Sequence, residues 1–325
     1  LSLKPSHLYL QFEIIIMKTP ILVTGSHRSG TTWVGNMIAQ SAEVHYIKEP
    51  FNVDHPPGKG ICAAQFDYWY TQLDSRNGEA YRKPFQKTIS FSYDLLEVLK
   101  EPISKKRAYQ ILSEYRAFLH SRAFGKRALL KDPLALFSAD WLFKEFDTQN
   151  IVLIRHPAAF ASSLKRKNWG FDFSHFVAQE QLFDDLDFHF RDEVFEYSKS
   201  QKSIIEQAIL LWRILHSKIF QYQKKYPDWM FVRHEDISMN PASEYRKIFE
   251  YLKLDFSLNI QQIIFDYSSS DNPTEAKNGV THVLRRDSKA NVKSWQKRLT
   301  LAEIQQIRNG VQDVSPYFYT DSEWQ

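Results

Sequence analysis

The chain has 325 residues and a formal net charge of +4 at pH 7, a length that suits one large α/β domain. The charge is too small for a nucleic-acid-binding surface, and the lone Cys62 excludes an intramolecular disulfide. No run approaches the roughly 20 apolar residues that span a bilayer, so we expect no membrane span and a cytoplasmic location.

The first methionine is Met17, so we interpret residues 1–16 as an N-terminal extension that the core does not need. Residues 17–325 then form a single domain. Two segments of it, 52–104 and 170–200, lack a clear periodicity, and the second is aromatic and acidic. We expect both to be insertions that shape an acceptor cleft.

Strands and helices alternate along the domain. Short apolar runs predict strands at Ile21–Thr24, Val44–Ile47, Ala128–Lys131, Ile151–Ile154 and Met230–Val232. Helical spacing predicts helices after Gly30, over 108–124, over 134–146, from about Ala158, over 204–219, over 244–252 and from about Leu301. This alternation predicts a three-layer α/β fold in which a mainly parallel central sheet is flanked by helices.

The stretch from Pro20 to Trp33 reads as a buried strand, a glycine-containing loop and a helix, which is the usual arrangement of a phosphate-binding loop. Gly25 and Gly30 have the spacing of a P-loop, but Thr31 stands where nucleoside triphosphatases carry lysine. Arg28 lies inside the loop instead. An ATP-dependent kinase or NTPase is therefore the less favoured interpretation.

The loop sequence GSHRSGTTW resembles the first phosphate loop of the sulfotransferases that use 3′-phosphoadenosine 5′-phosphosulfate (PAPS). The resemblance extends over most of residues 20–310 and implies a P-loop-type fold, PAPS as cofactor, PAP as product and no required metal. Because no membrane anchor is visible, a bacterial enzyme is expected. Trp33 packs on the adenine or fills the core, and His27 contacts sulfonate oxygens or, as we favour, faces solvent. The cofactor contacts that the resemblance implies in this loop are Arg28, Ser29, Gly30, Thr31, Thr32 and Trp33.

A second segment, Ile151 to Arg166, is a buried strand that ends at Arg155 and leads into a helix. Ligands of open α/β sheets bind at the carboxyl ends of the strands, so Arg155 is expected in the same pocket as the loop. The segment resembles the one with which the family binds the 3′-phosphate, and the resemblance assigns that role to Arg155 and Ser163.

A third, looser match is the basic stretch that precedes Trp295 and resembles the segment closing over the 3′-phosphate. The glycine often found there is absent, so the contacting residue stays open, and a solvated charge run is the alternative. The candidates in this stretch are Arg285, Arg286, Ser288 and Lys289.

Sulfuryl transfer requires a base for the acceptor hydroxyl and a cation for the departing phosphate. Arg28 suits the second role. For the base we predict Glu49, because EVHYIKEPF resembles the Glu-Pro stretch of carbohydrate sulfotransferases, which also favours a carbohydrate or glycolipid acceptor. The alternative for Glu49 is a surface ion pair with Lys48, in which case His45, His55 or His156 is the base.

Two acidic features are interpreted as structural. Asp132 follows an apolar strand as in a Walker B motif, but we expect it to orient Lys131 or Arg28. Asp184, Asp185 and Asp187 do not have a metal-binding spacing and are expected on a solvated face. A protein that binds PAP without catalysis is the non-enzymatic alternative.

Overall fold

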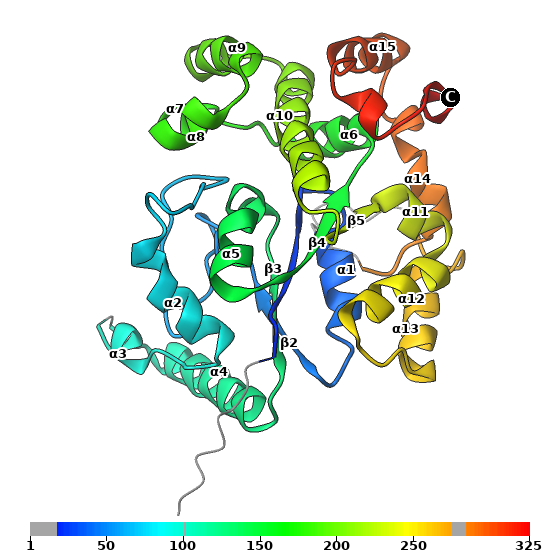
Figure 1. Cartoon of the computed structure of the whole chain (residues 1–325). Helices are drawn as coiled ribbons and strands as arrows, with labels where there is room; N and C mark the ends of the chain where they lie inside the picture. Colours follow the sequence, from blue (N-terminus) through cyan, green and yellow to red (C-terminus); the bar gives the residue numbers. More distant parts are fainter. Residues whose placement is uncertain (1–17, 101, 275–283) are drawn as a thin grey trace, which may run out of the picture.

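The computed structural model describes residues 18–100, 102–274 and 284–325, so the interpretation of residues 1–16 lies outside the described part. At its centre is a five-stranded sheet in the order β2-β3-β1-β4-β5 (Figure 1). All four neighbouring pairs are parallel. The predicted three-layer α/β fold is confirmed. The strands are β1 (Ile21–Gly25), β2 (Val44–Lys48), β3 (Arg127–Lys131), β4 (Gln149–Ile154) and β5 (Met230–Arg233).

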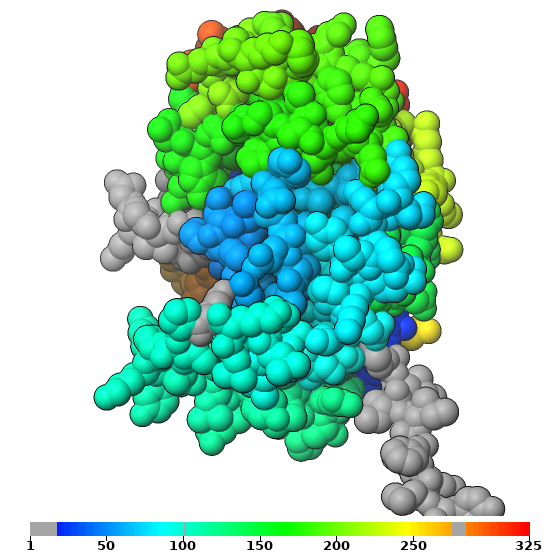
Figure 2. Space-filling model, turned by 90° about the vertical axis from the view of Figure 1, so that its left-hand side faces the viewer, coloured from blue at the N-terminus to red at the C-terminus, as the bar shows by residue number. Residues whose placement is uncertain are grey.

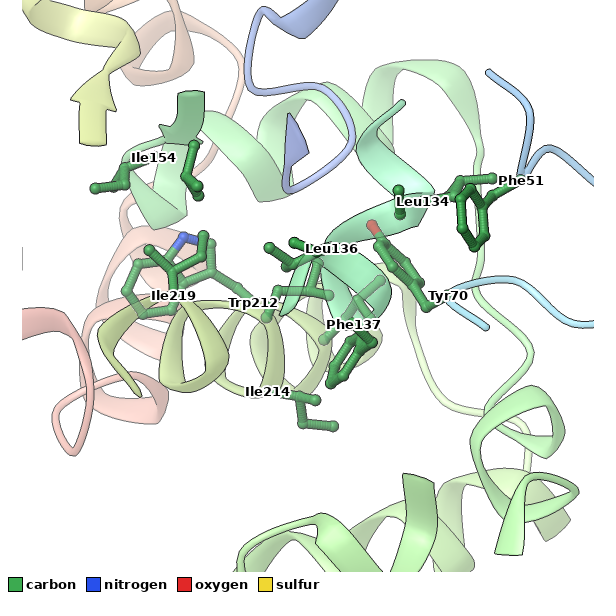
Figure 3. Packing of buried hydrophobic residues seen from close by; sticks show 14 of the residues in the cluster. Phe51, Tyr70, Leu134, Leu136, Phe137, Ile154, Trp212, Ile214 and Ile219 are labelled. Carbon is green, nitrogen blue, oxygen red and sulfur yellow. The ribbon is translucent and has the colours of Figure 1, made fainter. Parts of the chain in front are cut away.

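The alternation of side chains along the strands divides the core into two clusters, one on each face of the sheet. Burial on both faces explains why the strands read as unbroken apolar runs. The first cluster, seen in Figure 3, joins the sheet to α2 (Glu79–Ile89), α5 (Ala139–Phe146), α6 (Pro157–Lys167) and α10 (Ile204–Lys225). The second joins it to α1 (Thr31–Ile38), α12 (Pro241–Leu252) and α13 (Leu258–Ser268).

Most predicted helices form, including α4 (Lys105–Ala123) and α15 (Leu301–Gly310). The single helix predicted over 134–146 is wrong at its start: a 3-10 helix, η1 (Pro133–Ser138), precedes α5. Asp132 caps the first turn of η1, where its carboxylate accepts the Leu134 N–H at 2.9 Å. Sequence reasoning did not identify α13, nor the short helices α11 (His234–Met239) and α14 (Ser288–Val292).

The two expected insertions lie side by side. The first carries α2 and α3 (Leu95–Val98), and the second carries α7 (Ser174–Val177), α8 (Glu180–Asp185) and α9 (Phe188–Lys199). In Figure 2 the blue-to-cyan surface of the first borders the green surface of the second. The Gln72 N–H donates to the Gln179 side chain at 3.0 Å across this boundary.

The C-terminal end of the chain contacts residues at the ends of β4 and β5. It contains three 3-10 helices, η2 (Ser294–Lys297), η3 (Ser315–Tyr317) and η4 (Asp321–Trp324). Within the described ranges, no helix has the length and apolarity needed to cross a membrane.

Candidate active site

The loop between β1 and α1 requires glycine at both of its predicted positions. Gly25 and Gly30 have φ of 135° and 96°, in the region that favours glycine. A Cβ on Gly25 would lie 2.3 Å from the Leu153 carbonyl oxygen, and one on Gly30 would lie 2.6 Å from His234 Nδ1. Within the described part of the chain, no side chain caps α1, and its first turn contains no acidic residue. Its first N–H groups are therefore available to an anion.

A cavity of about 830 Å³ opens beside this loop, at the carboxyl edge of the sheet. It brings together ten of the thirteen candidate site residues: Arg28, Gly30, Thr31, Thr32, Trp33, Glu49, Arg155, Ser163, Arg286 and Ser288. Ser29 is buried beneath the loop, where its hydroxyl donates to the Ser26 carbonyl at 2.5 Å. Arg285 does not line the cavity, although its guanidinium is 5.1 Å from the ring centroid of Tyr267, which does. The exposed Lys289 is outside the lining too.

Arginines dominate one part of the cavity. Arg28 Nε donates to Ser163 Oγ at 3.0 Å, and the Arg155 guanidinium donates to the Arg28 carbonyl. Burial, followed by the charges of neighbouring arginines, lowers the pKa of Arg28 to about 10. Burial likewise lowers the pKa of Arg155 to about 10. This concentration of positive charge favours binding of an anion. The arginines that line the cavity are Arg28, Arg155, Arg166, Arg286 and Arg298.

Arg155 interacts with Trp212 and with the buried Glu235. Its backbone carbonyl accepts a hydrogen bond, at 2.8 Å, from the indole N–H of Trp212, a residue of α10. Glu235, a buried carboxylate that accepts the His156 N–H at 3.1 Å and the Tyr319 hydroxyl at 2.9 Å, contributes an attractive charge. The Arg155 Nε is buried and has no partner among the described residues. A buried donor without a partner, on a side chain that lines an arginine-rich cavity, fits a role in binding phosphate.

Glu49 forms an ion pair with Lys131, not with Lys48 as the surface alternative supposed. The Lys131 side chain is 1% exposed, and Asn52 donates to the second Glu49 oxygen at 2.6 Å. Burial by itself raises the pKa of the Glu49 carboxyl, but the Lys131 charge and these hydrogen bonds outweigh it and hold the pKa below its usual value. Glu49 has φ of 45°, an uncommon conformation for a non-glycine residue. The cavity therefore contains an ionised, fixed carboxylate.

Asp132 has a structural role, but among the described residues its hydrogen bonds go to backbone N–H groups and not to Lys131 or Arg28, which it was expected to orient. Its carboxylate accepts the backbone N–H groups of Phe51 at 2.6 Å and Leu134 at 2.9 Å, and it is fully buried outside the cavity lining. In the acidic trio, Asp185 pairs with Arg76 at 2.7 Å. Over the described ranges, no group of His, Cys, Asp and Glu side chains is arranged to hold a metal ion.

The histidines separate into two groups. His45 bonds Ser121 at 2.7 Å and His156 stacks on Trp295 at 5.2 Å, so neither lines the cavity and neither is placed to act as the base. His55 lines it from an exposed loop. The solvent-facing position favoured for His27 is wrong, because its ring is half-buried and bonded to Tyr70.

Aromatic side chains line another part of the cavity, and both insertions supply them: Trp69 from the first, and Phe171 with His175 from the second. Trp169 lies at the junction, where the Arg28 guanidinium is 5.2 Å from its ring centroid. Sequence reasoning missed these residues as well as His234, Arg166, Arg298 and the partner role of Lys131. Of these, Lys131 and Arg166 lay in segments that it had considered, the third strand and the segment Ile151 to Arg166.

The chain was compared with known proteins. The model of the "Sulfotransferase family" matches residues 20–257. No curated protein sequence matches significantly. Among solved structures, the sulfotransferase domain of the curacin biosynthetic pathway is 14% identical, with a TM-score of 0.48 over 91% of this chain and 98% of that one. The sulfotransferase domain of the Synechococcus PCC 7002 olefin synthase is 16% identical, with a TM-score of 0.47 over 93% and 96%.

A mouse sulfotransferase complexed with PAP is 13% identical, with a TM-score of 0.47 over 94% of this chain and 86% of that one. The family match spans well over half of the sequence and contains the loop, the strand end at Glu49 and the strand end at Arg155. The chain therefore belongs to the PAPS-dependent sulfotransferase family.

Proposed function

We propose that this enzyme transfers the sulfuryl group of PAPS to a hydroxyl of a carbohydrate or glycolipid, with Glu49 as the general base. The observation that carries the proposal is the composition of one cavity, which has a phosphate loop and arginines in one part and a fixed carboxylate nearby. When bound, PAPS supplies the sulfuryl group and leaves as PAP.

The residues suited to hold the nucleotide are those whose donors are directed to the cavity. The N–H groups at the start of α1 and the Arg28 guanidinium suit the phosphosulfate end. Arg155 and Ser163 suit the 3′-phosphate, and Arg286 and Ser288 also line the cavity. Trp33 lines the cavity and also packs edge-on against Tyr245, with ring centroids 5.6 Å apart, so either of its expected roles suits this position.

Glu49 is suited to accept the proton of the acceptor hydroxyl. Its carboxylate is ionised at neutral pH and is oriented by Lys131 and Asn52. The lowered pKa makes Glu49 a weaker base. Proton transfer to Glu49 nevertheless becomes favourable as the acceptor oxygen bonds to sulfur, because the hydroxyl proton then becomes more acidic. Arg28 faces charge that grows on the leaving phosphate, which places its main contribution in the transition state.

The aromatic part of the cavity supports a carbohydrate acceptor. Trp69 and Trp169 offer flat apolar faces, while Lys48, Asp54 and His175 offer polar groups to hydroxyls. Asp132 argues against the kinase alternative, because both of its carboxylate oxygens are occupied by backbone N–H groups.

A calorimetric comparison of PAP with AMP tests the cofactor. We expect PAP to bind far more tightly, because only PAP offers a phosphate to Arg155 and Ser163. Equal affinity for the two nucleotides would contradict the assignment. An acceptor library with labelled PAPS tests the reaction, and we expect label on carbohydrate hydroxyls. PAP binding without transfer to any acceptor would instead indicate a catalytically inert protein.

A further inference from the structure

Tyr70 fixes the ring of His27, the loop residue directly before Arg28. The His27 backbone N–H donates to the Tyr70 hydroxyl oxygen at 3.3 Å, and His27 Nδ1 lies 2.5 Å from the same oxygen. Tyr70 is fully buried and has φ of 59°, in the left-handed region. The Phe160 ring packs edge-on against the imidazole, with centroids 5.1 Å apart. The orientation of the imidazole is therefore determined by its surroundings.

This geometry selects one tautomer of His27. The Tyr70 hydroxyl has a single proton, and among the described residues Nδ1 is its only hydrogen-bond acceptor. If Nδ1 carried a proton, the hydroxyl proton would be buried without a partner. Nδ1 is therefore the acceptor, and a neutral ring carries its proton on Nε2. Burial, with a contribution from Arg28, lowers the pKa of His27 to about 3, so the ring is neutral at pH 7.

His27 lines the cavity with a half-buried ring. In the described part of the chain Nε2 is bonded to no other group and is not among the buried polar atoms that lack a partner, so it is open to a ligand in the cavity. Arg28 follows His27 in the loop, and the Trp69 ring lies near the imidazole, with ring centroids 6.2 Å apart. His27 is therefore close both to an arginine and to an aromatic side chain of the cavity lining.

We propose that His27 is a catalytic residue whose Nε2–H donates a hydrogen bond to a peripheral oxygen of the transferring sulfuryl group, with Tyr70 as its positioning residue. The inference rests on the proposed function. The bond from sulfur to the bridging oxygen breaks and its electron pair stays on the phosphate. A bond from sulfur to the acceptor oxygen forms, and the acceptor proton goes to Glu49. His27 keeps its proton throughout and acts as a preorganised neutral donor.

Two substitutions of His27 distinguish the contribution of Nε2 from that of Nδ1. Glutamine places its amide nitrogen near the position of Nε2, whereas asparagine reaches only as far as Nδ1. We expect kcat of H27N to fall about 10²–10³-fold, the usual cost of removing one such donor, and kcat of H27Q to stay within about tenfold of the unmodified enzyme. PAP affinity should change little in either variant. Equal losses in the two variants, or a loss confined to PAP affinity, would overturn the proposal.

¹⁵N NMR of the histidines in the full chain with PAP bound provides a readout that does not depend on turnover. We expect His27 to remain the neutral Nε2–H tautomer from pH 5 to 8, and Y70F to convert it to a mixture with lower kcat at unchanged PAP affinity. An Nδ1–H tautomer or a protonated ring in this pH range would contradict the role proposed for His27, but not the proposed function of the enzyme. Normal PAP binding without any sulfate transfer by the unmodified chain contradicts the sulfotransferase assignment instead.

Discussion

Glu49 depends on Lys131, a residue 82 positions away in the sequence, for both its position and its charge. Glu49→Gln keeps the shape of the side chain and the contact with Asn52 but removes the carboxylate. We expect kcat to fall at least about a hundredfold while PAP affinity stays near that of the unmodified enzyme. Because Lys131 is then buried without a counter-charge, the free energy of unfolding should also fall, by up to about 3–5 kcal/mol. Near-normal turnover in a folded Glu49→Gln variant would redirect attention to His55.

The Lys131 charge also sets the pH dependence of Glu49. Since the folded-state pKa of this carboxyl is depressed, its stabilising contribution is present above the unfolded-state pKa and is lost as pH falls through the folded value. Lys131→Met removes the largest of the effects that oppose burial, so the pKa of Glu49 rises. The acidic limb of kcat/KM should therefore move to higher pH. Lys48→Met is the matched control from the adjacent strand end, and it should leave the limb nearly in place. A similar displacement in both variants would contradict the assignment of Lys131 as the partner.

The β1 loop and α1 act as one element whose shape depends on Gly30. Gly30→Ala adds a Cβ 2.6 Å from His234 Nδ1 at φ of 96°, so the loop must distort. We expect PAP affinity to fall at least about tenfold, because the N–H groups of α1 are displaced from the anion. Gly125→Ala is the control, with φ of 55° and no atom within 4 Å of the added Cβ. It should cost about 1–2 kcal/mol of stability and leave PAP binding unchanged, as calorimetry and thermal unfolding can check.

The same element shows what the sequence could and could not predict. β1, the loop and α1 are contiguous, so spacing alone identified them. The strand ends at Glu49 and Arg155 followed from the rule that ligands bind at the carboxyl edge of a parallel sheet. The pairing of Glu49 with Lys131 and of His27 with Tyr70 joins residues 82 and 43 positions apart, which no local pattern encodes. The helix α11 was missed because His234, Glu235 and Asp236 read as a polar strand end.

For the whole molecule, a net charge of +4 conceals a strong local concentration. The fold gathers cavity arginines from the β1 loop, the end of β4, α6, the segment before α14 and the end of η2. Burial is the main reason that the pKa values of Arg28 and Arg155 are lowered, and the positive charges of neighbouring arginines lower them further. The ligand-free protein therefore holds a destabilising arrangement that a bound anion relieves, as expected where a site is built for binding and not for stability.

This arrangement predicts opposite effects of one substitution on the free and bound protein. PAP at about 100 times its Kd should stabilise the unmodified chain by about 2.7 kcal/mol, or about 4 °C in Tm for this length. Arg286→Met removes a charge that repels both Arg28 and Arg155. In the Arg286→Met variant, Tm without ligand should stay the same or rise. PAP affinity should fall about tenfold to a hundredfold, so the increase in Tm that PAP causes should be smaller at the same PAP concentration. Arg285→Met, next to it but outside the cavity, should change neither quantity. Thermal unfolding with and without PAP distinguishes the two variants, and an equal loss of the PAP-induced shift in both would mean that this basic stretch acts only through its general charge.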